Sequence, residues 1–280
     1  MKLLSYRIGG EASYGLLTAD DGIIDLKARL GQPTLHLAIA AGALEGLDGR
    51  LAGVAADHRL DDVEPMIPVP DAEKIICIGR NYRGHVAEGA QELPKTPSTF
   101  IRLHNSFVPP GGALVRPKLS EQFDYEGELA LVIGTGGRHI HAADAFDHIA
   151  GYTVMQESCI RDYQFQHCLT IGKNFTASGS IGPWMVTSDE IPDVSALTLT
   201  TTLNGTEVQH TKTNDFIFDI PAIIAYLSGV IELSPGDIIS TGTPEGVGFV
   251  RKPPLWLKPG DEIDVEVSGI GVLHNTVVAE

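Results

Sequence analysis

Three glutamates border apolar runs that are typical of buried β-strands. Glu126 and Glu128 lead into the run at 129–133, and Glu157 follows the run at 150–156. Residues two apart on a strand project from the same face, so Glu126 and Glu128 point together. Carboxylates crowded at the ends of core strands repel one another and lose hydration, and a bound cation offsets both costs. Oxygen ligands suit Mg²⁺, Mn²⁺ or Ca²⁺ rather than zinc, so the pattern predicts a divalent-metal site. The alternative, for the first pair alone, is a solvated strand end.

A histidine and a glutamate three residues apart, His85 and Glu88, form a second candidate group. In a helix these two side chains share one face. A glutamate that bonds to a histidine fixes the tautomer of the ring and raises its basicity, which suits a general base. The glycines and proline around the pair favour a mobile lid. The alternative is an ordinary surface pair on a helix.

Two cations follow the third glutamate along the chain. Arg161 lies four residues after Glu157 and can clamp a carboxylate with two hydrogen bonds. Lys173 can hold an anionic oxygen near a metal. The glycine-rich turn at 240–248 offers backbone N–H groups and hydroxyls to a carboxylate. Read singly, each cation is more typical of a solvated surface.

The elements that must position these residues are mostly short strands. Asn204 and Gly205 predict a hairpin turn, and Asp219 predicts the N-cap of a helix. The glycine-rich stretches lack the strand–GxGxxG–helix arrangement of a nucleotide binder. The pattern therefore predicts a β-rich α+β protein with a small N-terminal β-rich domain at 1–70 and a larger domain at 71–280. The expected strands lie within 3–26 and at 74–79, 127–134, 150–157, 197–213, 237–243 and 262–269, and the expected helices at 33–47 and 219–231.

The charge balance narrows the class of partner. Lys and Arg total 20 against 36 for Asp and Glu, which gives a formal net charge of -16. Such a surface repels phosphate backbones, so we expect no nucleic-acid partner. No run reaches the roughly 18 apolar residues of a membrane span, and the first residues lack the apolar run of a signal peptide. The three cysteines lack metal-ligand spacing and are typical of reduced thiols. We expect a cytoplasmic protein without a membrane partner.

Taken together, the motifs resemble the fumarylacetoacetate hydrolase family. The region before residue 70 is similar to the small leading domain of bacterial members. The resemblance implies a mixed β-sandwich roll for the larger domain and a homodimer. The matching strings, in family order from about residue 75 to the C-terminus, are ICIGRNYRGHVAE, DYEGELALVIG, AGYTVMQESCIRDYQ, GKNF, GPW, NGTEV, IPAIIAYLS, PGDIISTGTPEGVGF and LKPGDEIDVEVSGIG.

The resemblance also implies roles for single residues. It implies a divalent metal on the three glutamates and, as in hydrolytic members, a His85–Glu88 dyad on a lid that orders when substrate binds. It further implies contacts to the carboxylate and oxo groups of the substrate from Arg161, Gln164, Lys173 and Thr243. One departure stands out, because most relatives have Asp where this chain has Glu157. Glutamate is one methylene longer, so the metal must shift or the ligand must bind differently.

The chemistry that follows is hydrolysis of a carbon–carbon bond in a 1,3-dicarbonyl, acylpyruvate-like acid. Mg²⁺ or Mn²⁺ chelates the 2-oxo acid end, and His85, oriented by Glu88, deprotonates a water that attacks the distal carbonyl. The metal and Lys173 stabilise the enolate that leaves. The same enolate leaves a 2-oxo acid decarboxylase or an isomerase as alternatives. A non-catalytic binding protein stabilised by metal is a remote third, because a structural site needs no base.

Overall fold

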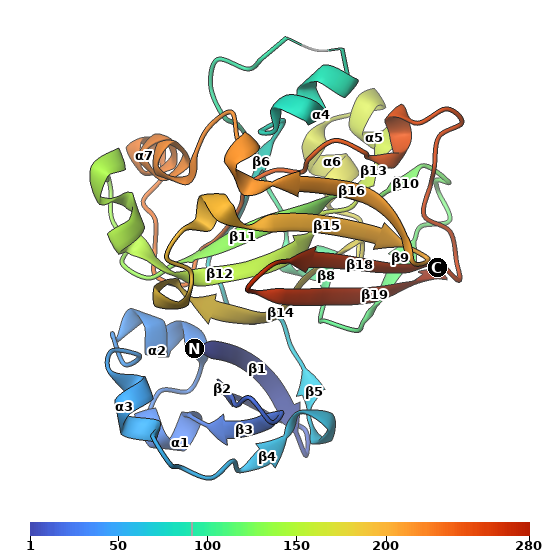
Figure 1. The fold of residues 1–280 in the computed structure, drawn as a ribbon. Coiled ribbons are helices and arrows are strands. Elements are labelled where there is room, and N and C mark those ends of the chain that lie inside the picture. The colour runs from blue at the N-terminus through green and yellow to red at the C-terminus, as the bar shows by residue number, and fades with distance from the viewer. Residues whose placement is uncertain (91) are drawn as a thin grey trace.

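A large mixed β-sheet forms the centre of the computed structural model, which describes residues 1–90 and 92–280. One of its inner strands, β11, is buried along its whole length, as its continuous apolar sequence predicts. Along the sheet lie β4 (His58–Arg59), β3 (Gly22–Asp25), β2 (Glu11–Leu17), β1 (Lys2–Ile8), β14 (Gly179–Thr187), β12 (Ile149–Gln156), β11 (Gly127–Ile133), β17 (Ile238–Ser240), β6 (Ile75–Gly79) and β7 (Ser98–Ile101), while β5 (Glu64–Pro65) pairs with β1 and β8 (Phe107–Val108) with β14 (Figure 1).

A second sheet packs on the first and completes a sandwich. One buried cluster joins Leu129 and Val154 of the large sheet to Leu199, Val265 and Leu273 of the second. The β-rich α+β class is therefore confirmed. The second sheet runs β16 (Thr206–Lys212), β15 (Thr198–Leu203), β18 (Glu262–Val267), β19 (Gly271–Ala279) and β9 (Ala113–Arg116), and a small third sheet pairs β10 (Phe123–Asp124) with β13 (Cys159–Ile160).

The predicted hairpin turn is confirmed, and an irregularity follows it. Asn204 and Gly205 both have positive φ, at 51° and 74°, as a tight two-residue turn between β15 and β16 requires. Further along, Thr201 pairs with Gln209 but Thr202 pairs with Glu207, so Val208 is left over as a β-bulge. The bulge places Val208 and Gln209 both on buried positions.

The α-helices that follow residue 80 lie at two places. α7 (Ile220–Val230) is capped by Asp219, which accepts a bond from Ala222 N at 2.9 Å, as predicted. α4 (Arg83–Glu88), α5 (Arg161–Gln166) and α6 (Leu169–Lys173) lie at the end of the sandwich opposite the N-terminal strands (Figure 1). The 3-10 segments are η1 (Leu60–Asp62), η2 (His104–Ser106), η3 (Ala142–His148), η4 (Ser188–Glu190), η5 (Val194–Ala196), η6 (Thr213–Asp215) and η7 (Gly248–Val250).

The N-terminal region differs from expectation in its helix. Instead of one helix at 33–47, the chain forms α2 (Leu35–Ala40) and α3 (Leu47–Leu51), after a short α1 (Lys27–Leu30). Gly42 and Gly46 have positive φ between them and interrupt the alanine-rich pattern. β1 pairs with β14 through Lys2 and Leu3, so these strands extend the large sheet, while the domain boundary near residue 70 stays a prediction. None of the helices among the described residues is long and apolar enough to cross a membrane.

Candidate active site

The three predicted glutamates meet at one end of two neighbouring strands. Glu126 and Glu128 flank Gly127, the first residue of β11, and Glu157 follows Gln156, the last residue of β12. Gly127 and Gln156 face each other across this antiparallel pair. One carboxylate atom from each glutamate lies within 4.8 Å of the others, and all three side chains are buried. The predicted convergence of these carboxylates is confirmed.

Two of the predicted cations lie inside this cluster. Lys173 Nζ lies 2.8 Å from Glu126 Oε2 and also forms an ion pair with Glu157 Oε2. Arg161 donates from Nε to Asp124 Oδ2 at 2.7 Å and pairs through Nη2 with Glu126 Oε1. Both cations are buried, so the interpretation as solvated surface residues is wrong. In this structure they neutralise the protein's own carboxylates, and their contacts to substrate stay predictions.

Two charged residues of the cluster received no role from the sequence. Arg102 donates from Nη1 to Glu157 Oε1 at 2.8 Å and is 1% exposed. Asp124 is fully buried and also accepts bonds from the backbone of η7. An arginine directly after a strand resembles a surface residue in the sequence, and its burial comes from packing by distant segments. Asp124 does stand in the DYEGE string, which is the one signal that could have drawn attention to it.

The electrostatics of the cluster fit a divalent cation. Burial, together with the neighbouring carboxylates of Glu157 and Glu126, raises the pKa of Glu128 well above its ordinary range. Burial also acts to raise the pKa of Glu126, but Lys173 and Arg161 outweigh it and hold that pKa below its ordinary range. Among the described residues, ion pairs join three carboxylates, those of Asp124, Glu126 and Glu157, to three cations. Glu128 takes part in none of these ion pairs, so the cluster would have one negative charge in excess if Glu128 also ionised. The donors are oxygens, as Mg²⁺ and Mn²⁺ prefer.

The predicted His–Glu pair forms on α4. His85 Nδ1 lies 2.7 Å from Glu88 Oε1, and Gly246 N donates to Glu88 Oε2 at 2.8 Å. The buried side chain of Asn81 anchors the start of this helix, because it accepts from Phe218 N at 2.8 Å and donates to Phe218 O at 3.0 Å. The helix is therefore tied to neighbouring segments at both ends, and lid motion stays a prediction.

Thr243 and Gln164 also reach the cluster. Thr243 Oγ1 donates to Gly127 O at 3.0 Å and accepts from Gln209 Nε2 at 2.9 Å. Gln209, brought inward by the β-bulge, also accepts from Gly127 N at 2.9 Å and so links the backbone between Glu126 and Glu128 to the Thr243 turn. Gln164 Oε1 accepts from Arg161 Nη1 at 2.9 Å. The roles of Thr243 and Gln164 toward substrate stay predictions.

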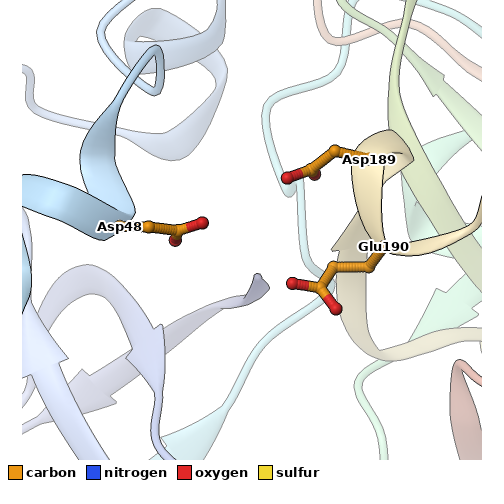
Figure 2. A group of neighbouring side chains, drawn as sticks. All are labelled: Asp48, Asp189 and Glu190. Atoms are coloured by element: carbon orange, nitrogen blue, oxygen red, sulfur yellow. The ribbon is translucent and has the colours of Figure 1, made fainter.

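A cavity of about 220 Å³ opens onto both groups. It is lined by the three glutamates and by His85, Lys173, Arg161, Gln164, Thr243, Arg80, Ile78, Gly79, Ser98, Phe100 and Leu169. A larger cavity, of about 930 Å³, lies between η4, η6 and the start of α7 and includes none of these carboxylates. A further acidic group, Asp48 of α3 with Asp189 and Glu190 of η4, is exposed (Figure 2). The smaller cavity is the candidate active site, because chemistry-bearing groups converge there.

Comparisons with known proteins identify the family to which the chain is similar. The model of a family described as fumarylacetoacetate (FAA) hydrolase C-terminal matches residues 74–278. The mitochondrial oxaloacetate tautomerase of Xenopus laevis is 37% identical over 290 residues, which cover 99% of this chain and 90% of that protein.

Two solved structures share the fold over the whole chain. Maleylpyruvate hydrolase from a Sphingobium species, in complex with manganese(II) ion and pyruvate, has a TM-score of 0.83 and 28% identity and covers 100% of this chain and 99% of its own. The 2-hydroxyhepta-2,4-diene-1,7-dioate isomerase from Mycobacterium marinum has a TM-score of 0.78 and 30% identity, with the same coverage. A structural relative thus binds manganese, and the present chain has a buried acidic cluster able to hold a divalent cation.

Proposed function

This chain belongs to the fumarylacetoacetate hydrolase family, and from that premise we propose that it catalyses keto–enol tautomerisation of a small 2-oxo dicarboxylate such as oxaloacetate. The observation that carries the proposal is the polar cavity of about 220 Å³ shared by His85 and the three glutamates. Pockets for drug-sized ligands span about 300 to 1,000 Å³, so this volume suits a four-carbon acid better than a long acyl chain. The name of the Xenopus relative, oxaloacetate tautomerase, supports the same reaction.

His85 is the proposed base. With the proton of the ring on Nδ1, bonded to Glu88 Oε1, the lone pair of Nε2 is available to take a proton. Tautomerisation removes a proton from carbon 3 of the substrate and delivers one to the 2-oxo oxygen, so a single imidazole can accept and then return it. General-base help of this kind contributes about 10² to 10⁴ in rate.

The cluster is proposed to bind and polarise the substrate. A divalent cation, Mg²⁺ or Mn²⁺, held by Glu126, Glu128 and Glu157, would supply a Lewis acid for the 2-oxo group. Lys173 places its positive charge beside the oxygen on which negative charge develops. The remaining proposed contacts, to the carboxylate groups of the substrate, come from Arg161, Gln164 and Thr243.

Carbon–carbon hydrolysis of an acylpyruvate-like acid is the second candidate. The His85–Glu88 pair can activate a water as readily as it can take a proton from carbon, and the fold resembles that of maleylpyruvate hydrolase. Water would add to the distal carbonyl, and the bond to carbon 3 would break with the pyruvate enolate as the leaving group. Isomerisation or decarboxylation would use the same enolate.

Two substrates distinguish the candidates. Purified protein with Mn²⁺ is given the enol form of oxaloacetate, followed by its ultraviolet absorbance, and separately acetylpyruvate, followed by release of pyruvate. We expect Mn²⁺-dependent interconversion of oxaloacetate and much slower cleavage of acetylpyruvate. Glu128→Gln, which removes a proposed metal ligand, is the matched control and should be inactive. If acetylpyruvate is cleaved rapidly while oxaloacetate interconverts at the uncatalysed rate, hydrolysis replaces tautomerisation as the first candidate.

We also propose that the chain forms a homodimer, as the family resemblance implies, and that it is cytoplasmic, as the sequence analysis predicts. Sedimentation velocity of the purified chain tests the dimer, and a single monomeric species at micromolar concentration would contradict it.

A further inference from the structure

Arg102 lies beside the glutamate cluster with every donor of its side chain engaged. A guanidinium carries five N–H donors in a rigid fork. Here Nη1 donates to Glu157 Oε1 (2.8 Å) and Ser158 O (3.3 Å), Nη2 to Ser178 Oγ (2.9 Å) and Ser106 O (3.2 Å), and Nε to Ser106 Oγ (3.1 Å). Its orientation is therefore fixed.

The surroundings of Arg102 leave room for this guanidinium and little else. The Phe107 ring lies 4.3 Å from its Cζ. A Cβ atom on Gly179 would lie 2.9 Å from Nη1 and 3.0 Å from Nη2, so glycine keeps that space open. Four of the five hydrogen bonds hold the arginine to the scaffold, and one reaches Glu157. Arg102 thus presents a donor at a fixed place, to which the carboxylate must adapt.

Each glutamate of the cluster has one oxygen held by the protein. The holding groups are Arg102 for Oε1 of Glu157, Arg161 for Oε1 of Glu126, and Ser240 Oγ with Gly242 N (3.0 Å) for Oε2 of Glu128. The opposite oxygens of Glu126 and Glu157 both contact Lys173 Nζ, so these two converge on one point. A cation that displaced the Lys173 ammonium would therefore find one oxygen of each carboxylate available.

We propose that Arg102 is a positioning residue that makes Glu157 a one-oxygen ligand and so favours Mg²⁺ or Mn²⁺ over Ca²⁺. This inference rests on the proposed metal-dependent function. Ca²⁺ takes about six to eight oxygens and often both oxygens of a carboxylate, whereas Mg²⁺ keeps strict octahedral geometry with few protein ligands. A carboxylate tied to Arg102 cannot offer both oxygens. The extra methylene of glutamate over aspartate lets residue 157 reach Arg102 and the cluster together.

The test is the ratio of metal affinities, measured by titration calorimetry on protein stripped of metal by a chelator. Arg102→Lys keeps the charge but loses the fork. Its Mn²⁺ affinity should fall by about 10- to 100-fold, the usual effect of removing a partner of a metal ligand. Its Ca²⁺ affinity should fall less or rise, so the preference for Mn²⁺ over Ca²⁺ should become smaller. Arg251→Lys is the matched control, because Arg251 donates to the carbonyls of Val208 and Gly246 and should leave both affinities unchanged.

A double-mutant cycle isolates the pathway through Glu157. If Arg102 acts through that carboxylate, Arg102→Lys combined with Glu157→Asp should bind Mn²⁺ no more weakly than Glu157→Asp alone. Additive losses overturn the proposal, and so does an equal loss of Mn²⁺ and Ca²⁺ affinity in Arg102→Lys.

Three further outcomes are decisive. If Arg102→Lys does not fold, Ser178→Ala takes its place, because it removes one hydrogen-bond partner of the same guanidinium. Ser178→Ala must then reduce the preference for Mn²⁺ over Ca²⁺, and an unchanged preference overturns the proposal. Wild-type protein that binds neither ion overturns the proposed function together with this inference. Wild-type protein that binds Mn²⁺, beside an Arg102→Lys variant with unchanged affinities, overturns this inference alone.

Discussion

Replacing Glu88 by glutamine tests whether the His–Glu pair performs chemistry. Both oxygens of Glu88 act as acceptors, Oε1 toward His85 Nδ1 at 2.7 Å and Oε2 toward Gly246 N at 2.8 Å. Glutamine has one acceptor oxygen and one donor nitrogen. If its oxygen stays with Gly246, its NH₂ group faces Nδ1 and forces the ring proton onto Nε2, where it blocks the base. If its oxygen turns to His85, a donor faces the N–H of Gly246 and the helix end loosens.

The size of the effect follows from the bond that is lost. A hydrogen bond to a charged group contributes about 1.5 to 3 kcal/mol, and both side chains are largely buried, at 12% and 19% exposure for His85 and Glu88. At about 1.4 kcal/mol for each factor of ten, we expect Glu88→Gln to lower kcat by about 10- to 150-fold. Metal affinity should not change, because Glu88 does not contact the glutamate cluster.

The assay is steady-state turnover of enol oxaloacetate with saturating Mn²⁺, beside calorimetric titration of Mn²⁺. Glu207→Gln is the matched control, since Glu207 lies 3.6 Å from His210 in another Glu–His pair three residues apart, exposed on β16. That variant should keep wild-type kcat. A folded, metal-loaded Glu88→Gln enzyme with wild-type kcat would refute the reasoning and leave the pair as a simple helix contact.

Three other substitutions probe the base and the cluster. His85→Ala should keep the fold and the metal affinity but lose about 10² to 10⁴ in kcat, and unfolding in circular dichroism would instead make His85 a core residue. Because the pKa of Glu128 is raised in the folded chain, metal-free wild type loses stability as pH rises above the unfolded pKa of about 4.3. Metal-free Glu128→Gln lacks this loss. In calorimetric melts its melting temperature should therefore lie above that of metal-free wild type at pH 8 and equal it near pH 4. A lower melting temperature of the variant at pH 8 would contradict the raised pKa of Glu128. Lys173→Met should raise Mn²⁺ affinity by about tenfold or more, because the ammonium no longer competes for two ligand oxygens. The same variant should have a lower kcat, and weaker Mn²⁺ binding would contradict the prediction.

Local patterns predicted the elements well where neighbouring residues determine them. The apolar runs gave β11 and β12, Asn204 with Gly205 gave the hairpin, and Asp219 gave the start of α7. The prediction of one long N-terminal helix was wrong. It followed the alanine-rich periodicity and gave too little weight to Gly42 and Gly46, which lie between α2 and α3 with positive φ. Boundaries of this kind depend on backbone conformations that composition only suggests.

The glutamate cluster was predictable, but its balance of charge was not. Local patterns predicted mutual repulsion, yet Lys173 and Arg161 hold Glu126 ionised and Arg102 binds Glu157. Arg102 lies 55 positions before Glu157 in the chain. No spacing rule joins residues so far apart, and only the pairing of strands and the packing around them brings the two together.

The same balance explains how one site can hold both a cation and an anionic substrate. Lys173 bridges Oε2 of Glu126 and Oε2 of Glu157. A divalent cation that takes these oxygens must displace the ammonium, whose stem starts from the end of α6 and whose side chain already lines the cavity. With all four carboxylates ionised, the bound cation would change the net charge of the cluster from one negative to one positive and would leave Lys173 free to face the substrate. On the proposed function, metal binding would therefore create the positive potential that an acidic substrate needs, within a protein whose net charge of -16 would otherwise repel it.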